Sequence, residues 1–168
     1  GRVRRKGGMD AEAFDRYFTA RYPVLVGHVT AMWGDPDAAA DAVQEAFVRA
    51  WTKRREFGRH PHPDAWIRTV ARNLLTDGWR RRRRHSPLDH EPTVTGPDAA
   101  EWISLQRALR ELPPNQRDAI VLHYLADLPV ARVAEELDAQ PGTVRVWLSR
   151  GRDRLGVLLD EDKEPRHA

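Results

Sequence analysis

The chain has 168 residues, of which 40% are hydrophobic and 32% charged, with a formal net charge of +3 and no cysteine. The lack of cysteine excludes disulfides, thiolate catalysis and cysteine-based zinc sites, and no apolar run approaches the length of a membrane span. Residues 1–84 carry 18 Lys or Arg against 10 Asp or Glu, residues 85–99 carry none against 3, and residues 100–168 carry 10 against 12. This asymmetry predicts two modules and favours a polyanionic partner for the basic half.

Residues 1–9 precede the first predicted helix. They are basic but lack a following apolar segment, so no signal peptide is expected in them. Two interpretations stay open for them: a flexible leader, or an expression remnant with Met9 as the natural start. The simplest expected location is the cytoplasm.

The first module is predicted to be helical, because apolar residues recur at helical spacing and no segment alternates as a strand. Its expected helices cover residues 10–21, 24–33, 36–54 and 64–83. Asp35 followed by Pro36 is a typical N-cap and first-turn pair. The stretch 56–63, EFGRHPHP, holds one Gly and two Pro and is predicted to be a loop. The core positions expected in the third helix are Ala39, Val43, Ala46, Phe47, Ala50 and Trp51.

Residues 85–99 are predicted to be an extended, acidic linker, because they contain three Pro, one Gly and no periodicity. The second module then follows from residue 100 to residue 159, with residues 160–168 as a short acidic tail. Its expected helices cover residues 101–111, 116–125, 130–137 and 142–159. The fold class is therefore all-α, with two small helical domains.

The last two of these helices form a helix-turn-helix pattern, in which a short helix braces a second one that lies in the DNA major groove. Val144, Leu148 and Leu155 form the inward stripe, and polar or basic residues lie off it. Alone, this pattern also fits an ordinary helical bundle. Trp147 is expected to pack rather than to stack on a base. The outward residues predicted to contact DNA are Thr143, Arg145, Val146, Ser149, Arg150 and Arg152, with Arg154 as a further phosphate candidate.

Three stretches together resemble the extracytoplasmic-function (ECF) group of bacterial sigma-70 factors. DAAADAVQEAFVRAW, from Asp37 to Trp51, resembles region 2.2, and DAWIRTVARNLLTDGWRRRRR, from Asp64 to Arg84, resembles regions 2.3 and 2.4. Residues 109–155, LRELPPNQRDAIVLHYLADLPVARVAEELDAQPGTVRVWLSRGRDRL, resemble region 4. The resemblance implies a factor that binds core RNA polymerase and directs it to promoters. Region 2 (residues 10–84) would dock on the clamp coiled coil and open the −10 element. Region 4 (residues 100–159) would read the −35 element and sit on the flap.

The resemblance assigns residues to these roles in region 2. Phosphate contact is favoured for the run of five arginines from Arg80 to Arg84, because helix capping does not need so many. For Asn73, Asp77 and Arg80, DNA contact and pairing within the fold weigh equally. The residues expected to dock on polymerase are Asp41, Gln44, Glu45 and Val48. Those expected at the −10 DNA are Phe57, Arg59, His60, His62, Trp66, Asn73, Asp77, Arg80, Arg81 and Arg84.

The resemblance has departures and open points. Many relatives carry a small polar and then a basic residue where this chain has Val146 and Trp147, so the −35 sequence stays open. The linker is either a tether or, as the resemblance implies, a negatively charged segment in the RNA channel. A metal at His60 and His62 is not expected, because no further ligands are apparent.

Competing classes are a conventional activator or repressor, a nucleic-acid enzyme and a structural adaptor. No effector domain, catalytic constellation or P-loop is visible, so we expect no catalytic residues, no metal and no cofactor. The expected partners are core RNA polymerase, promoter DNA and an anti-sigma factor. We expect no membrane insertion and a monomer when the chain is free of partners.

Overall fold

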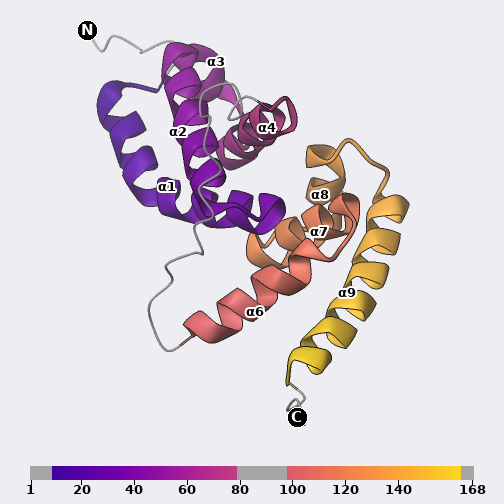
Figure 1. The fold of residues 1–168 in the computed structure, drawn as a ribbon. Helices are drawn as coiled ribbons and strands as arrows, with labels where there is room; N and C mark the ends of the chain where they lie inside the picture. The colour runs from indigo at the N-terminus through magenta and orange to yellow at the C-terminus, as the bar shows by residue number, and fades with distance from the viewer. Residues whose placement is uncertain (1–8, 79–97, 164–168) are drawn as a thin grey trace, which may run out of the picture. The chain divides into compact units, whose positions relative to one another are not determined.

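A computed structural model describes residues 9–78 and 98–163. The leader, the arginines from Arg80 to Arg84 and most of the predicted linker lie outside the described residues. Throughout the described ranges the secondary structure is helical, without a strand. The described chain divides into two compact units, which we call the N-terminal unit (residues 9–30 and 35–78) and the C-terminal unit (residues 31–34 and 98–163) (Figure 1). None of the described helices combines the length and apolar character needed to cross a bilayer.

The N-terminal unit contains most of α1 (Ala11–Trp33) together with α2 (Pro36–Thr52), α3 (Arg54–Arg59) and α4 (Pro63–Thr76). Alanines face inward along α2, at Ala38, Ala39, Ala42, Ala46 and Ala50, and short side chains allow a neighbouring helix to approach closely. Aromatic rings also pack in this core, where Phe14, Tyr17 and Phe18 of α1 contact the ring of Phe47 on α2.

The predicted start of α2 is confirmed. The Asp35 carboxylate accepts hydrogen bonds from the backbone N–H groups of Asp37, at 3.0 Å, and Ala38, at 3.1 Å. Pro36 occupies the first turn, where its missing N–H removes no helical hydrogen bond.

Three predictions for this unit are wrong. The two helices expected over residues 10–33 are one helix that continues through Pro23, because side chains on both sides of this proline, including Phe18 and Leu25, join the same core. The expected loop over residues 56–63 instead begins as α3, because Phe57 is fully buried in that core. In addition, Trp51 is 39% exposed rather than inward.

The C-terminal unit contains α6 (Ala99–Arg110), α7 (Pro114–Ile120), the π-helical turn η1 (Val121–Leu125), α8 (Val130–Glu136) and α9 (Pro141–Lys163). The helix-turn-helix pattern is confirmed in α8 and α9, because Val133 on α8 and Val144 and Leu148 on α9 are buried in one core. Asp138 lies in the turn between them with a positive φ of 52°, a conformation that an aspartate adopts more readily than most residues.

Candidate functional site

The outward side of α9 presents the side chains that the sequence predicts to contact DNA. All six are exposed, whereas Val144, Leu148, Gly151 and Leu155 on the same helix are buried. Val146 is 45% exposed, and Trp147 is partly buried against the core as expected. We call the exposed set the α9 face: Thr143, Arg145, Val146, Ser149, Arg150 and Arg152.

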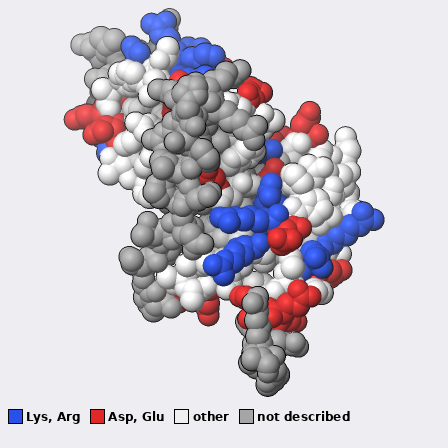
Figure 2. All heavy atoms as spheres, viewed as in Figure 1, with Lys and Arg blue, Asp and Glu red and all other residues white. Residues whose placement is uncertain are grey.

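Tyr124 on η1 adds a residue to the α9 face that the sequence did not single out. Its hydroxyl accepts a 3.1 Å hydrogen bond from Nη1 of Arg152, and its side chain is 49% exposed. The contact crosses 28 residues of sequence, so no local pattern predicts it. Figure 2 shows Lys and Arg side chains gathered over the C-terminal unit, with acidic side chains toward the end of the chain.

A second predicted surface lies on α2. Gln44 and Val48 are exposed and Asp41 and Glu45 are partly exposed, while Val43, on the opposite side of the helix, is buried. We call these four residues the α2 face. Val48 is 54% exposed, so the α2 face combines a solvent-exposed apolar side chain with two carboxylates. Glu45 also forms an ion pair with Arg49, one turn further along α2, with 3.5 Å between Oε1 of Glu45 and Nε of Arg49.

The third predicted surface combines α4 with the α3–α4 loop, which consists of residues 60–62. His60, His62 and the preceding Arg59 are exposed, as are Asn73 and Asp77 on α4. The ring nitrogen Nδ1 of His60 accepts a 3.0 Å hydrogen bond from the backbone N–H of His62. Arg80, Arg81 and Arg84 belong to this predicted surface but lie outside the described residues.

Phe57 does not belong to this surface. Its side chain is 0% exposed, and its ring contacts those of Phe14, Tyr17 and Trp66. The predicted contact of Phe57 with DNA is therefore wrong, because its ring is used in the core. Trp66 is only partly exposed, since one side of its ring packs on Phe57 at 5.3 Å between centroids.

A polar cluster attaches the first turn of α4 to α1. The hydroxyl of Tyr17 donates a 2.6 Å hydrogen bond to Oδ1 of Asp64, and Nη2 of Arg21 donates a 2.7 Å hydrogen bond to Oδ2. Nε of Arg21 lies 3.1 Å from the same Oδ2. One carboxylate therefore joins two side chains of α1, a contact that the sequence analysis missed.

The charges in this cluster shift the pKa values of its members. Partial burial acts to raise the pKa of Asp64, but the hydrogen bonds from Arg21 and Tyr17 outweigh burial and hold this pKa below its ordinary value. Partial burial, together with the bond to Asp64, raises the pKa of Tyr17 far above its ordinary value. Asp64 is therefore an acceptor and Tyr17 a donor at neutral pH.

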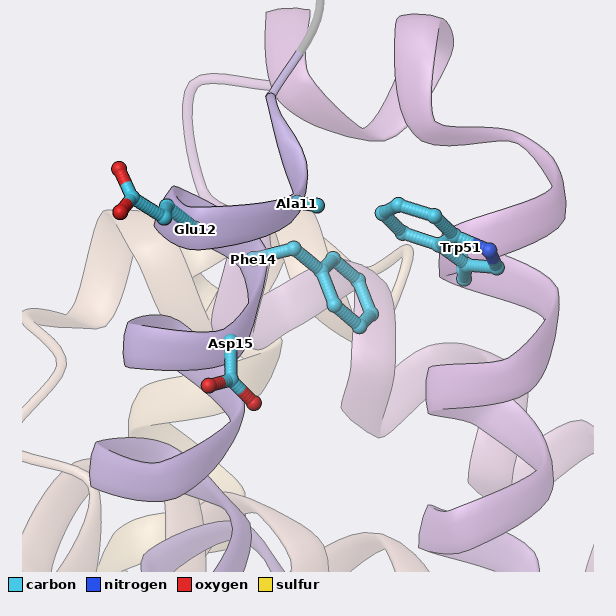
Figure 3. Close-up of a pocket in the computed structure, with 5 residues that line it drawn as sticks. All are labelled: Ala11, Glu12, Phe14, Asp15 and Trp51. Atoms are coloured by element: carbon cyan, nitrogen blue, oxygen red, sulfur yellow. The ribbon is translucent and has the colours of Figure 1, made fainter.

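An open groove of about 420 Å³ lies between the start of α1 and the end of α2. Figure 3 shows the rings of Phe14 and Trp51 facing each other, with Glu12 and Asp15 on the α1 side; the ring centroids are 5.2 Å apart. The described residues that line the groove include no Ser, Thr, Cys, Lys or His. In the described part of the chain, no group of three or more His, Cys, Asp or Glu side chains is arranged to hold a metal ion.

Comparisons with known proteins match both units. A family model described as "Sigma-70 region 2" matches residues 17–85, and one described as "Sigma-70, region 4" matches residues 102–155. The chain is 30% identical over 154 residues to the ECF RNA polymerase sigma factor SigM of Mycobacterium tuberculosis, a match that covers 89% of this chain and 79% of that relative. It is also 30% identical over 156 residues to a probable RNA polymerase sigma factor, RfaY, of Xanthomonas campestris. That match covers 84% of this chain and 39% of the relative's length.

Among solved structures, the chain is similar to the sigma factor RpoE of Bartonella quintana, determined in complex with the anti-sigma factor NepR. The TM-score is 0.72 at 26% sequence identity, and the match covers 91% of this chain and 100% of that one.

Proposed function

This chain belongs to the ECF group of the sigma-70 family of RNA polymerase sigma factors, and we propose from this membership how its two units divide the work. Members of this family bind core RNA polymerase and direct promoter-specific initiation of transcription. In our proposal, residues 10–84 act as region 2 and residues 100–159 as region 4. The observation that carries the proposal is that the predicted contact residues on α2, α4 and α9 are exposed or partly exposed, while the opposite side of each helix is buried.

The α2 face is the proposed docking surface for the clamp coiled coil of polymerase. Its carboxylates suit a basic helix hairpin, since complementary charge guides docking. Val48 supplies the apolar contact that a stable interface needs at its centre. Because 54% of the surface of Val48 is exposed, covering this side chain by a partner contributes favourably to the free energy of binding.

The outward side of α4 and the α3–α4 loop form the proposed contact with the −10 element. Opening the duplex requires a place to hold an unpaired base by stacking or hydrogen bonding. His60 and His62 offer rings for stacking and nitrogen atoms for hydrogen bonds, and both are exposed. Asn73 and Asp77 lie further along α4, and the arginines from Arg80 to Arg84 are the proposed phosphate contacts.

The α9 face is the proposed reader of the −35 element. Arg145 and Arg152 carry donors that fit the guanine edge in the major groove, and Val146 offers an apolar contact for a thymine methyl group. Arg150 and Arg154 are exposed on the same helix and are proposed to bind phosphates, which fixes orientation rather than sequence.

The remaining roles are also proposals from family membership. The chain is no enzyme by itself, since polymerase carries out the chemistry, and it acts where bacterial polymerase acts, in the cytoplasm. An anti-sigma factor is proposed to cover the α2 face, the α9 face or both, as the free protein would otherwise compete continuously for core enzyme. Without partners the chain is proposed to be a monomer. Residues 85–99 are the proposed linker between the regions.

The test is run-off transcription with purified bacterial core polymerase on a library of promoter fragments, with and without this protein. Transcripts that start at defined sites only in its presence support the proposal. If the protein neither supports initiation nor co-migrates with core polymerase, the proposal fails. In that case, sequence-specific duplex binding without polymerase would favour a conventional helix-turn-helix regulator.

A further inference from the structure

The α3–α4 loop is anchored at both of its ends by buried or paired side chains. Phe57, three residues before the loop, is fully buried. Asp64, two residues after it, is held by hydrogen bonds to α1. The three loop residues between these anchors are exposed. The conformation of the loop therefore depends on the distance and orientation that the two anchors impose.

Tyr17 on α1 contacts both anchors. Its ring lies 5.5 Å from the ring of Phe57, centroid to centroid, in an edge-to-face arrangement. Its hydroxyl donates the 2.6 Å hydrogen bond to Oδ1 of Asp64. Edge-to-face ring contacts prefer a defined geometry, and hydrogen bonds to a carboxylate are short and directional. A single side chain thus joins the entrance and the exit of the loop.

In the described structure the start of α4 is attached by the hydrogen bonds of Asp64 and by the packing of Trp66 on Phe57, and not by a side-chain cap. His62 occupies the N-cap position but makes no side-chain capping hydrogen bond, although many helices are secured in that way. Asp64, in the first turn, directs its carboxylate to α1 instead, where Arg21 binds the second oxygen at 2.7 Å. The position of the first turn is therefore set by α1 rather than by a local cap.

We infer that Tyr17 and Asp64 are positioning residues for capture of the unpaired −10 base, because together they fix the two ends of the α3–α4 loop. The inference rests on the proposed function of this loop. Neither residue touches the base: His60 and His62 are the contact residues, and Tyr17 and Asp64 keep these rings in one arrangement. Contacts held in one arrangement discriminate better between ligands than mobile ones, because a mobile surface can adjust to several ligands.

The experiment compares holoenzymes assembled from bacterial core polymerase and the full chain. The probes are labelled single-stranded oligonucleotides that carry the −10 sequence from start-site mapping, and variants with each other base at each position. Selectivity is the ratio of Kd values between the variant and the mapped sequence. Tyr17→Phe removes only the hydroxyl, and Asp64→Asn removes the charge while keeping the shape. Each is expected to lower selectivity about five- to tenfold, with affinity for core polymerase unchanged.

Tyr22→Phe is the matched control. Tyr22 lies on the same helix, and its ring packs against Phe18 and Phe47, yet no contact joins it to either end of the loop in the described structure. This variant is expected to keep wild-type selectivity.

Two results would overturn the inference while leaving the proposed function intact. One is wild-type selectivity in both Tyr17→Phe and Asp64→Asn. The other is a parallel loss of core affinity and selectivity, which general unfolding explains. If the unmodified chain fails to support initiation, the proposed function fails and the inference falls with it.

Discussion

Gly151 on α9 faces Ile120 at the end of α7 so closely that a Cβ atom at position 151 would lie 2.9 Å from Cγ1 of Ile120. The same Cβ would lie 3.2 Å from Cδ1 of Ile120 and 3.5 Å from Cδ2 of Leu112. Gly151 is thus required by packing, because the helix that carries the α9 face rests directly on the core at this point.

Gly151→Ala is expected to destabilise the protein by about 1 kcal/mol, because overpacking costs about 1–3 kcal/mol and exceeds the gain in helix propensity. Gly156→Ala is the matched control on α9, where a Cβ meets no atom within 4 Å. It is expected to stabilise the helix by up to about 1 kcal/mol. Urea unfolding of both variants measures the difference, and equal effects would contradict the packing argument.

The N-cap of α2 is expected to contribute a similar amount to the free energy of unfolding. Asp35→Ala removes the acceptor for two backbone N–H groups and should lower the free energy of unfolding by about 1 kcal/mol. Asp35→Ser keeps an acceptor at the same position and should retain most of the stability. Thermal unfolding of the two variants distinguishes two roles of Asp35. If Asp35 acts as a hydrogen-bonding cap, serine retains most of the stability. If only its negative charge stabilises the helix, serine does not.

Asp64 is expected to make the stability depend on pH in the acid range. Its pKa is lower in the folded chain than its ordinary value, so it stabilises the fold above the pKa of the unfolded chain. This contribution is lost as the pH falls through the folded value. The difference in unfolding free energy between the wild type and Asp64→Asn should therefore shrink as the pH is lowered from about 7 to about 3. A difference that is constant with pH would contradict a role for the carboxylate charge.

Val48→Asp is expected to weaken binding to core polymerase about tenfold or more, because it places an additional charge in an interface that must exclude water. The fold should be retained, since Val48 is 54% exposed. Val24→Asp, at an exposed valine of α1 outside the α2 face, is the control and should bind as the wild type does. Equilibrium titration of labelled protein with core enzyme measures both. An equal loss of affinity for core polymerase in the two variants would show that the α2 face is not the docking surface.

Arg145→Ala is expected to weaken binding to the −35 duplex by about 1–3 kcal/mol and to relax the sequence preference at one base pair, if the guanidinium contacts a base edge. A uniform loss across sequences, with a shallower salt dependence, would assign Arg145 to a phosphate instead. Arg107→Ala, on the exposed side of α6, tests for a general effect of charge and should leave the preference unchanged.

The sequence predicted those parts of the fold that depend on local patterns. Asp35 and Pro36 define the start of α2 through local contacts alone, because the Asp35 carboxylate accepts from the N–H groups of the next turn. Helical spacing separates the buried Val144 and Leu148 from the exposed Arg145 and Ser149 on α9. These features need no knowledge of what lies across the core, and the same spacing identified most of the exposed candidate contacts.

Where the prediction failed, a non-local contact was decisive. Two helices were expected over residues 10–21 and 24–33, but the core on both sides of Pro23 keeps α1 continuous. Gly58 and the following prolines suggested a loop around Phe57, yet burial of that ring produces α3. The hydrogen bond between Tyr17 and Asp64 spans 47 residues, and nothing in the local sequence of either residue indicates it.

The most direct test of the central claim is a base-substitution scan of one mapped promoter, transcribed by core polymerase with this protein. The account predicts that loss of initiation is confined to two short elements, near −35 and −10. Val48→Asp should weaken initiation at every sequence, while Arg145→Ala should alter the response at the −35 element alone. Initiation that is indifferent to both elements, or that proceeds equally without the protein, would contradict the account.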